Sequence, residues 1–358
     1  MRLEKVLKEM QKRQLTHLII NDPLSIDYLI NYKNNPGERM YLLLLSSDGH
    51  HKLFMNNLFY LDHELDIEQV WYSDTDNYLQ LLADEFDGAC SIGIDKNFPA
   101  RFLIPLMNLV DECHFELGSE CVDRVRMIKD EKEQQLMIEA SKINDLVVDE
   151  VINICAKGDL TEEEVSKQLE GIYQKHGCVG NSFEPIVAYG KNGADNHHSG
   201  DDSRLKAGDS IVIDIGGLYK GYCSDMTRTV FYKEVSPKQK TVYELVLKAQ
   251  KAAEAMIKPG VRLCDIDKCA RDIIAEGGYT VEFNHRLGHF IGRDVHEWCD
   301  VSQNFDLEVQ EGMTFSIEPG VYLQGEFGVR IEDLILVTKD GCKVLNSYPK
   351  DLRVIGND

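Results

Sequence analysis

Residues 210–229 read SIVIDIGGLYKGYCSDMTRT, and this stretch is the most informative about how the second half of the chain folds. It begins with a nearly continuous apolar run of strand length that holds one acid, Asp214. A glycine turn follows, and the chain returns as a second expected strand with Asp225 at its start. An unpaired carboxylate in an apolar strand is unfavourable, so Asp214 is expected to meet a cation or several hydrogen-bond donors. The alternative is an ordinary turn aspartate. If Asp214 does meet a cation, Asp225 on the returning strand would stand opposite it.

A second unusual stretch, HRLGHFIG, holds His285 and His289 four residues apart. Glycines flank His289, and glycine allows the backbone to approach a tight site closely. His296 and Glu297 follow a few residues later. A single histidine is more often structural, but three histidines within residues 285–296 indicate a site.

Two further acids lie in strand-like settings. Glu318 ends an expected strand before a Pro-Gly turn in SIEPGVY. In the later stretch VRIEDLIL, strand alternation places Arg330 and Glu332 on one face and Asp333 on the other. Arg330 could then orient a ligand carboxylate. The acid pairs 214/225 and 318/332 each flank a Gly-X-Tyr turn, which suggests that each donates its carboxylates from a strand–turn–strand unit.

These acids and one histidine form an oxygen-rich set of expected metal ligands: Asp214, Asp225, His289, Glu318 and Glu332. Carboxylates with one imidazole suit hard or borderline divalent cations. Four carboxylates balance two dications, so we expect a pair of ions. Two ions about 3.5–4 Å apart can activate a water molecule and polarise a carbonyl group. The sequence therefore predicts amide hydrolysis without a covalent intermediate.

The 358 residues are expected to form two domains, residues 1–125 and 126–358, each large enough to bury a core. The first reads as an α/β unit without a chemical constellation, in which short apolar strands alternate with helices. Its expected strands cover residues 16–20, 41–45, 52–55 and 91–95, and its expected helices cover residues 1–10 and 76–86. The second reads as an α+β unit. Its expected helices cover residues 129–157, a segment from Thr161 onward, 237–256 and 263–276, and its expected strands cover residues 210–215, 227–232, 313–317 and 329–337.

The composition limits the kinds of molecule that the protein can bind and indicates where in the cell it is located. A formal net charge of -22 argues against nucleic acid and against anionic membranes, because both require a basic face. No apolar stretch approaches the roughly 18 residues of a membrane span, and the N-terminal residues resemble a charged amphipathic helix rather than a secretory signal. The ten cysteines include no CxxC pair and read as reduced thiols, the alternative being a disulfide framework. We expect a soluble cytoplasmic protein.

At these stretches the sequence resembles the pita-bread (M24) metallopeptidases, in particular the proline-specific branch that contains Xaa-Pro dipeptidase (prolidase) and aminopeptidase P. The matching stretches are residues 214–229, 285–297, 318–322 and 330–333. Any one of them is a weak signal, but together they are highly specific. The resemblance implies a pita-bread catalytic domain, preceded over residues 1–125 by the creatinase-type N-terminal domain of this family.

The resemblance also implies roles for the site residues. Asp214 would bind one metal through both oxygens, Asp225 and Glu332 would bridge two metals, and His289 and Glu318 would complete the second. Glu318 would also act as general base. Outer-shell and supporting roles are implied for His197, His285, His296, Tyr322 and Arg330. Mn²⁺ is the first expectation for the metal, with Co²⁺, Zn²⁺ and Fe²⁺ as alternatives, and a homodimer is implied.

The assignment of His197 rests on register in GKNGADNH, so His198 is an alternative. The chain departs from the family pattern at three places. Asn196 stands where proline is usual, Phe290 where glycine is usual, and Trp298 and Cys299 follow His296-Glu297 where a proline is common nearby. Phe290 and Trp298 are expected to reshape the substrate pocket.

The implied activity is hydrolysis of the imide bond before proline, in Xaa-Pro dipeptides because the chain is short. The alternative is an Xaa-Pro aminopeptidase that acts on longer peptides. The filled ligand positions disfavour both a metal-free creatinase and a non-catalytic binding protein of this fold. Methionine aminopeptidase shares the ligands, but the extra N-terminal domain and the pair His285 and His296 disfavour it.

Overall fold

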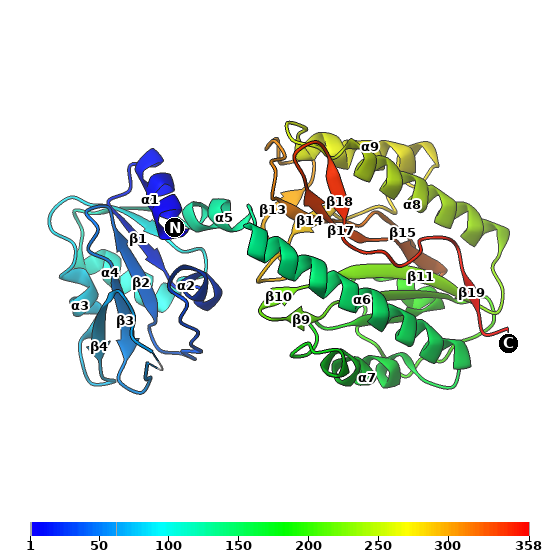
Figure 1. The fold of residues 1–358 in the computed structure, drawn as a ribbon, viewed down its shortest axis with the longest axis horizontal. Coiled ribbons are helices and arrows are strands. Elements are labelled where there is room, and N and C mark those ends of the chain that lie inside the picture. Colours follow the sequence, from blue (N-terminus) through cyan, green and yellow to red (C-terminus); the bar gives the residue numbers. More distant parts are fainter. Residues whose placement is uncertain (1, 62, 358) are drawn as a thin grey trace. The chain divides into compact units, whose positions relative to one another are not determined.

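The computed structural model describes residues 2–61 and 63–357 of the chain, which divides into two compact units, Met1–Arg126 and Met127–Asp358 (Figure 1). Each unit has hydrophobic cores of its own. All ten cysteines are free thiols, as predicted. Over the described residues, no helix combines the length and the apolar character that crossing a membrane requires.

The first unit is an α/β structure, as predicted. Its elements are α1 (Arg2–Lys12), β1 (His17–Ile20), α2 (Pro23–Ile30), β2 (Leu42–Ser46), β3 (Lys52–Asn56), β4 (Glu68–Tyr72), α3 (Tyr78–Ala83), β5 (Ser91–Ile94), α4 (Ala100–Leu109), β6 (His114–Leu117) and α5 (Glu120–Arg126). One mixed sheet has the order β4-β3-β2-β1-β5-β6. One core packs α1, α2 and α5 against the sheet, and another packs α3 and α4. Because both faces are covered, the central strand β2 is apolar and buried along its length.

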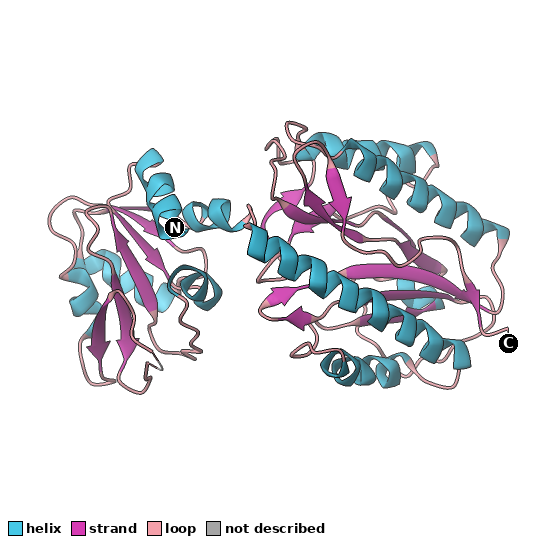
Figure 2. Cartoon of the chain, viewed as in Figure 1, coloured by secondary structure: helices cyan, strands magenta, loops and turns pink. Residues whose placement is uncertain are grey.

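The second unit is an α+β structure, also as predicted (Figure 2). Its elements are α6 (Glu131–Lys157), α7 (Glu162–Lys175), β7 (Ile186–Tyr189), the 3₁₀ helix η1 (Gly190–Ala194), β8 (Ser210–Ile215), β9 (Leu218–Tyr219), β10 (Tyr222–Cys223), β11 (Met226–Tyr232), α8 (Pro237–Met256), α9 (Leu263–Glu276), β12 (Gly288–Phe290), β13 (Glu297–Val301), β14 (Thr314–Ile317), β15 (Gly320–Leu323), β16 (Phe327–Arg330), β17 (Asp333–Val337), β18 (Cys342–Val344) and β19 (Val354–Ile355).

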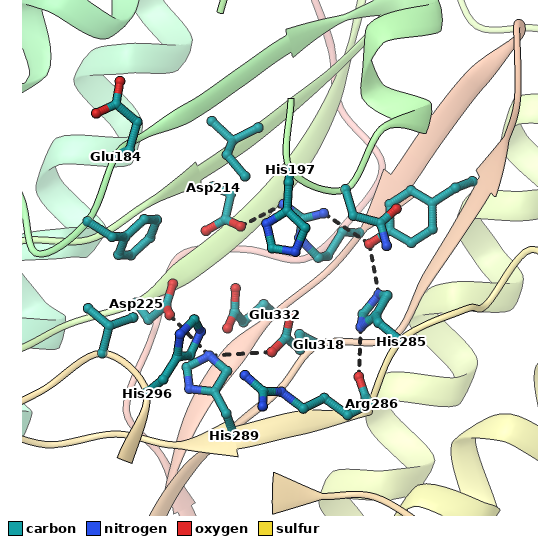
Figure 3. Close-up of a pocket in the computed structure, with 16 residues that line it drawn as sticks. Glu184, His197, Asp214, Asp225, His285, Arg286, His289, His296, Glu318 and Glu332 are labelled. Atoms are coloured by element: carbon teal, nitrogen blue, oxygen red, sulfur yellow. Dashed lines mark hydrogen bonds and ion pairs between the residues drawn. The ribbon is translucent and has the colours of Figure 1, made fainter. Parts of the chain in front are cut away.

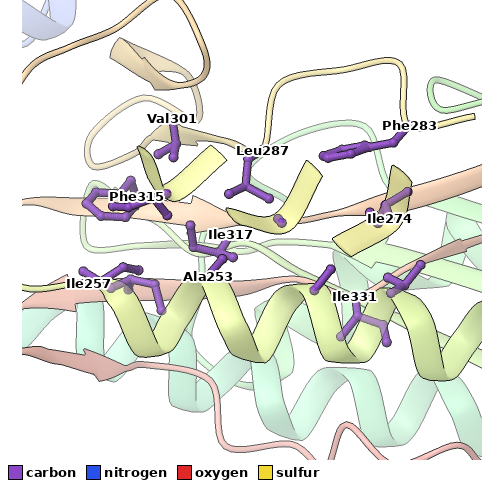
Figure 4. Packing of buried hydrophobic residues seen from close by; sticks show 14 of the residues in the cluster. Ala253, Ile257, Ile274, Phe283, Leu287, Val301, Phe315, Ile317 and Ile331 are labelled. Carbon is purple, nitrogen blue, oxygen red and sulfur yellow. The ribbon is translucent and has the colours of Figure 1, made fainter. Parts of the chain in front are cut away.

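Two helix pairs cover two sheets in this second unit. The helices α6 and α7 pack on the sheet β19-β11-β8-β7. The helices α8 and α9 lie side by side (Figure 1) and pack on the sheet β13-β12-β14-β17-β18. Figure 4 shows this second core, where Ala253 of α8 and Ile257 directly after it meet Phe315 and Ile317 of β14. Each sheet therefore has one face buried under helices, which leaves its other face to build a site.

Local sequence signals explain where the long helices begin. Each of α6, α7 and α8 starts with a capping box, in which the N-cap side chain and the third helical residue satisfy each other's backbone N–H groups. The N-cap residues are Asp130, Thr161 and Ser236. The helix expected from Thr161 onward is thus confirmed, with Thr161 as its N-cap residue.

Two expectations about strands are wrong. The expected strand over residues 329–337 is broken between β16 and β17, because the backbone N–H of Glu332 donates to Thr227 O (3.1 Å) instead of to a sheet neighbour. Asp225 does not stand opposite Asp214 either. The Cα partner of Asp214 in β11 is Thr227, and Asp225 lies just before β11 begins.

Candidate metal centre and active site

Every site residue expected from the sequence lines one pocket of about 320 Å³ in the second unit (Figure 3). The expected ligands at its base are Asp214, Asp225, His289, Glu318 and Glu332. The other expected site residues on its wall are His197, His285, His296, Tyr322 and Arg330. The fold thus brings together side chains that are more than a hundred positions apart in the chain.

The four carboxylates come from two similar structural units. Asp214 lies in β8 and Asp225 just before β11, and the hairpin β9–β10 separates them. Glu318 follows β14 and Glu332 precedes β17, and the hairpin β15–β16 separates these two. The strand–turn–strand echo in the sequence is therefore confirmed in the topology. The fifth expected ligand, His289, comes from β12 beside β14.

The atoms that could bind a metal converge. A carboxylate oxygen of Asp225, a ring nitrogen of His289 and a carboxylate oxygen of Glu332 all lie within 4.8 Å of one another. His289 Nε2 is 3.5 Å from Asp225 Oδ2 and 3.4 Å from Glu318 Oε1. The other ring nitrogen, Nδ1, is 3.2 Å from the carbonyl oxygen of Phe290. Because a carbonyl only accepts, Nδ1 carries a proton, which leaves Nε2 as the ring nitrogen that faces the carboxylates and is placed to bind a cation.

The electrostatics of this cluster fit divalent cations. Asp214 Oδ1, Asp225 Oδ1 and Glu332 Oε1 are buried and have no hydrogen-bond partner among the described residues. Burial, and then the charges of neighbouring acids, raise the pKa of Asp225 and of Glu332 well above the ordinary values. Burial also raises the pKa of Glu318. Buried carboxylate oxygens that repel one another and lack donors are a site for positive charge.

A hydrogen-bonded chain connects the ligands to the wall of the pocket. Arg330 Nη2 donates to Asp214 Oδ2 (2.6 Å), and Arg330 Nη1 donates to Tyr322 Oη (2.9 Å). Tyr322 Oη is 3.0 Å from Nε2 of His285, whose Nδ1 donates to the carbonyl oxygen of Arg286 (2.7 Å). Burial, and then the charge of Arg330, lower the pKa of His285 to about 3. The ring is therefore neutral and accepts the proton of the Tyr322 hydroxyl.

The other two expected histidines also lie at this pocket, in different settings. The rings of His296 and His289 are 4.3 Å apart. Burial, and then the proximity of His289, lower the pKa of His296 to about 4, so it too is neutral. His197 is exposed, and in Figure 3 its ring lies beside Asp214 and above Asp225, Glu318 and Glu332. Its neighbour His198 is not part of the pocket lining and contacts Glu162 instead (2.6 Å).

The departures from the family pattern act differently from what we expected. Phe290 is completely buried and packs on Phe315 (5.2 Å between rings) in the core under α8 and α9, so it does not reshape the pocket. Trp298 packs on Phe305 at the same core and also does not line the pocket. Asn196 does line it, and its side chain donates to Asn284 Oδ1 (2.8 Å).

Some residues of the site were missed. Thr227 Oγ1 donates to Glu332 Oε2 (2.7 Å), and Ser316 Oγ donates to Glu318 Oε1 (3.0 Å), so two hydroxyls hold the carboxylates. Strand alternation could have found both, because each lies on the same strand face as an expected ligand. The pocket wall also contains Phe183, Glu184, Ile186, Arg286 and Val295. Of these, Phe183, Glu184 and Ile186 lie in a segment without a chemical motif.

Comparison with known proteins agrees with this geometry. Residues 135–339 match metallopeptidase family M24, and residues 2–128 match the creatinase/prolidase N-terminal domain. The candidate dipeptidase YkvY of Bacillus subtilis is 44% identical over 241 residues, which are 67% of this chain and 66% of that protein.

Two solved structures are similar over nearly the whole chain. A recombinant prolidase from Thermococcus sibiricus has a TM-score of 0.93 and 32% identity, over 99% of this chain and 98% of that chain. An X-Pro aminopeptidase from Thermotoga maritima has a TM-score of 0.80 and 29% identity, over 96% of this chain and 99% of that chain. The second unit thus has the pita-bread fold, and the first is a creatinase-type N-terminal domain. The chain therefore belongs to metallopeptidase family M24, and it is a metallo-exopeptidase.

Proposed function

We propose that this protein hydrolyses the imide bond of Xaa-Pro dipeptides with a pair of divalent cations. Asp214, Asp225, His289, Glu318 and Glu332 would hold these ions. The observation that carries the proposal is the group of buried carboxylate oxygens without hydrogen-bond donors, which lies beside Nε2 of His289. Positive charge between these oxygens would offset their repulsion and replace their missing hydrogen bonds.

When bound, the cations would supply Lewis acidity and lower the pKa of a water molecule. The proton that this water releases must reach the proline nitrogen. In the imide bond this nitrogen has no hydrogen, and it leaves as a secondary amine only after it gains one. Glu318 is suited to this task. It lines the pocket and its pKa is raised, so it can take a proton from the attacking water and give it to the leaving nitrogen.

The histidines of the pocket wall would bind the substrate. His296 is neutral, so its ring offers an N–H group or a lone pair without adding charge near the cations. The neutral ring of His285 already has partners at both nitrogens, so it would shape the pocket wall and hold Tyr322 toward the substrate. His197 lies within reach of the same space and would contact the scissile amide. Between the two substrate classes, the higher TM-score with a prolidase than with an X-Pro aminopeptidase favours dipeptides. The alternative is cleavage of Xaa-Pro from longer peptides.

The test uses metal-free protein reloaded separately with Mn²⁺, Co²⁺, Zn²⁺ or Fe²⁺. We expect cleavage of Ala-Pro, and little cleavage of Ala-Pro-Ala or Ala-Ala, with Mn²⁺ as the most effective ion. Cleavage of Ala-Pro-Ala but not Ala-Pro would establish the aminopeptidase instead. Cleavage of none of the three peptides with any of the ions would refute the proposal.

Two variants separate metal binding from substrate contact. His289→Ala is expected to lose bound metal and activity together. His197→Ala is expected to keep the metal and to lower kcat about 10²-fold, as for loss of a proton-handling or polarising group. Metal analysis beside Ala-Pro hydrolysis distinguishes the two, and unchanged activity in either variant would contradict its role.

We also propose that the protein is a homodimer in the cytoplasm. The ten free thiols support a reducing compartment. Light scattering after size exclusion would test the assembly, since a mass near twice the 40.8 kDa of the chain is expected.

A further inference from the structure

One buried carboxylate fastens both ends of the loop that carries His197. This loop comprises residues 190–201, begins with η1 and ends before β8. The carboxylate belongs to Glu162, the first residue of α7, which is completely buried. It accepts four hydrogen bonds, from Tyr189 N (2.6 Å), Asn192 Nδ2 (3.0 Å), His198 Nε2 (2.6 Å) and Asp201 N (3.1 Å). The first two donors precede His197 in the chain and the last two follow it.

These contacts make a hydrogen-bonded clamp rather than a second metal site. One potential metal-binding atom from each of Glu162, His198 and Asp201 lies within 4.8 Å of the other two, a spacing that would also suit an ion. However, each oxygen of Glu162 already accepts two hydrogen bonds, unlike the unpartnered oxygens at the main centre. The ring nitrogen of His198 that faces Glu162 must carry its proton to donate, so it has no lone pair for a metal.

The imidazole of His197 depends on its backbone for its position. No hydrogen bond or ion pair of the described residues involves this ring; the one hydrogen bond of His197 joins its backbone N to Asp195 Oδ1 (3.1 Å). The neighbouring Asn196 donates to Asn284, and Gln324 donates to the carbonyl oxygen of Ala194 (2.7 Å). Besides these contacts, the loop is held by the four hydrogen bonds to Glu162 and by one from Glu163 N to the carbonyl oxygen of Asp201 (3.1 Å).

We propose that Glu162 and His198 are positioning residues, which hold the 190–201 loop so that His197 faces the bond to be cleaved. This inference rests on the proposed function, in which His197 contacts the scissile amide. His198 does not touch the pocket, so its effect on catalysis passes through His197. Small displacements of a group that contacts reacting atoms lower the rate strongly, and supporting residues typically contribute 10–100-fold.

A double-mutant cycle in the metal-loaded protein tests this pathway. His198→Ala is expected to lower kcat/KM for Ala-Pro about 10–100-fold without loss of bound metal. In a His197→Ala background, the same change should lower kcat/KM less than about twofold, because the residue through which it acts is already gone. His198→Gln should recover most of the rate, since the glutamine amide can donate to Glu162 from a similar position.

The chain contains a matched control at the other end of α7. His176 Nε2 lies 2.7 Å from Glu150 Oε1, another histidine–glutamate contact with a partly buried ring, and neither residue lines the pocket. His176→Ala should leave kcat/KM within about twofold of the wild-type value. Hydrogen–deuterium exchange gives a readout without substrate. Residues 190–203 should exchange faster in His198→Ala than in wild type or in His176→Ala.

The outcomes separate this inference from the proposed function. Equal rate losses for His198→Ala in both backgrounds would overturn the inference, and so would loss of bound metal in His198→Ala. If wild type cleaves no Xaa-Pro peptide, the proposed function fails, and exchange alone then decides whether the clamp exists. Unchanged exchange of residues 190–203 in His198→Ala would refute the clamp itself.

Discussion

Arg330 joins the expected metal ligands to the groups that would face the substrate. Its guanidinium donates to Asp214 (2.6 Å), to Tyr322 (2.9 Å) and, through Nε, to Thr227 Oγ1 (3.1 Å). Thr227 in turn donates to Glu332. The planar guanidinium can serve three partners in fixed directions, whereas an ammonium group is a point charge on a flexible stem. The fixed directions therefore help to place two of the four carboxylates.

Arg330→Lys should weaken metal binding about 10–100-fold, because lysine keeps the charge but cannot hold Asp214, Tyr322 and Thr227 at once. Calorimetric titration of metal-free protein with Mn²⁺ measures this. Arg262→Lys is a suitable control, since Arg262 makes a similar two-point contact to Asp265 on the surface. Equal affinities of Arg330→Lys and wild type would show that charge alone suffices.

The metal ligands could be predicted because acids and histidines in apolar or glycine-rich stretches are unfavourable unless they bind a partner. The roles of His197 and Tyr322 were implied only by the resemblance to the family. The neighbours of the ligands were harder to place. Phe290 follows His289 directly, and we expected its ring near the pocket. Successive side chains of a strand point to opposite faces, so a pocket-facing His289 sends Phe290 into the core. Pocket-wall residues such as Phe183 and Ile186 carry no local signal, because tertiary packing alone brings them to the site.

The close pairing of β12 and β14 determines how His289 and Glu318 meet. Ser316 in β14 accepts a hydrogen bond from His289 N (2.9 Å) and donates to Glu318. Gly288 makes this approach possible. A Cβ atom at Gly288 would lie 1.9 Å from the carbonyl oxygen of Ser316, which is far inside contact distance.

Gly288→Ala should therefore push β12 away from β14, lower the free energy of unfolding by roughly 1–3 kcal/mol and reduce bound metal. Denaturant unfolding and metal analysis give the two values. Gly171→Ala in α7 is the matched control, because no atom lies within 4 Å of its added Cβ. It should be neutral or stabilising, as expected for alanine in a helix. A Gly288→Ala protein with normal stability and metal content would refute this account of β12.

Asp333, next to Glu332, faces away from the pocket into a buried ionic cluster between β17 and α8. It accepts from Arg228 (2.7 Å), Gln250 (3.0 Å) and Lys350 (2.6 Å). Lys350 also contacts Glu254 on α8 (2.9 Å). Burial, and then the charge of Asp333, raise the pKa of Glu254 to about 7, although Lys350 opposes the shift. The broken strand before Asp333 was not predicted, because no glycine or proline marks the break.

This raised pKa predicts how stability depends on pH. Folded Glu254 binds a proton more tightly than unfolded Glu254, whose pKa is near 4.5, so its contribution is most favourable below about 4.5 and is lost as pH rises to about 7. The free energy of unfolding of wild type minus that of Glu254→Gln should fall between these values and stay constant above about pH 8. Urea unfolding of both proteins with saturating Mn²⁺ measures it, and a difference that does not change with pH would contradict the prediction.

Across the whole molecule, the candidate site lies within one of the two units. The expected ligands and the pocket wall belong to the unit Met127–Asp358, while the unit Met1–Arg126 is built around two cores of its own. The pattern of strands and helices predicted the fold class of each unit. The meeting of two sheets at one site could not be predicted from spacing, because strands from separate sheets come together only through the packing of the helix pairs behind them.

Removing the metal should therefore loosen one unit only. Without cations, the buried carboxylates of Asp225, Glu318 and Glu332 repel one another, which favours opening of the strands that carry them. Metal at 100 times its Kd stabilises the folded state by about 2.7 kcal/mol, or roughly 100-fold in exchange through global opening. Hydrogen–deuterium exchange of chelated and Mn²⁺-saturated protein should differ within residues 127–357 and agree within residues 2–61 and 63–126. His289→Ala should show no metal response. A response of equal size in both units would mean that they unfold together, and that the metal stabilises the chain as a single body.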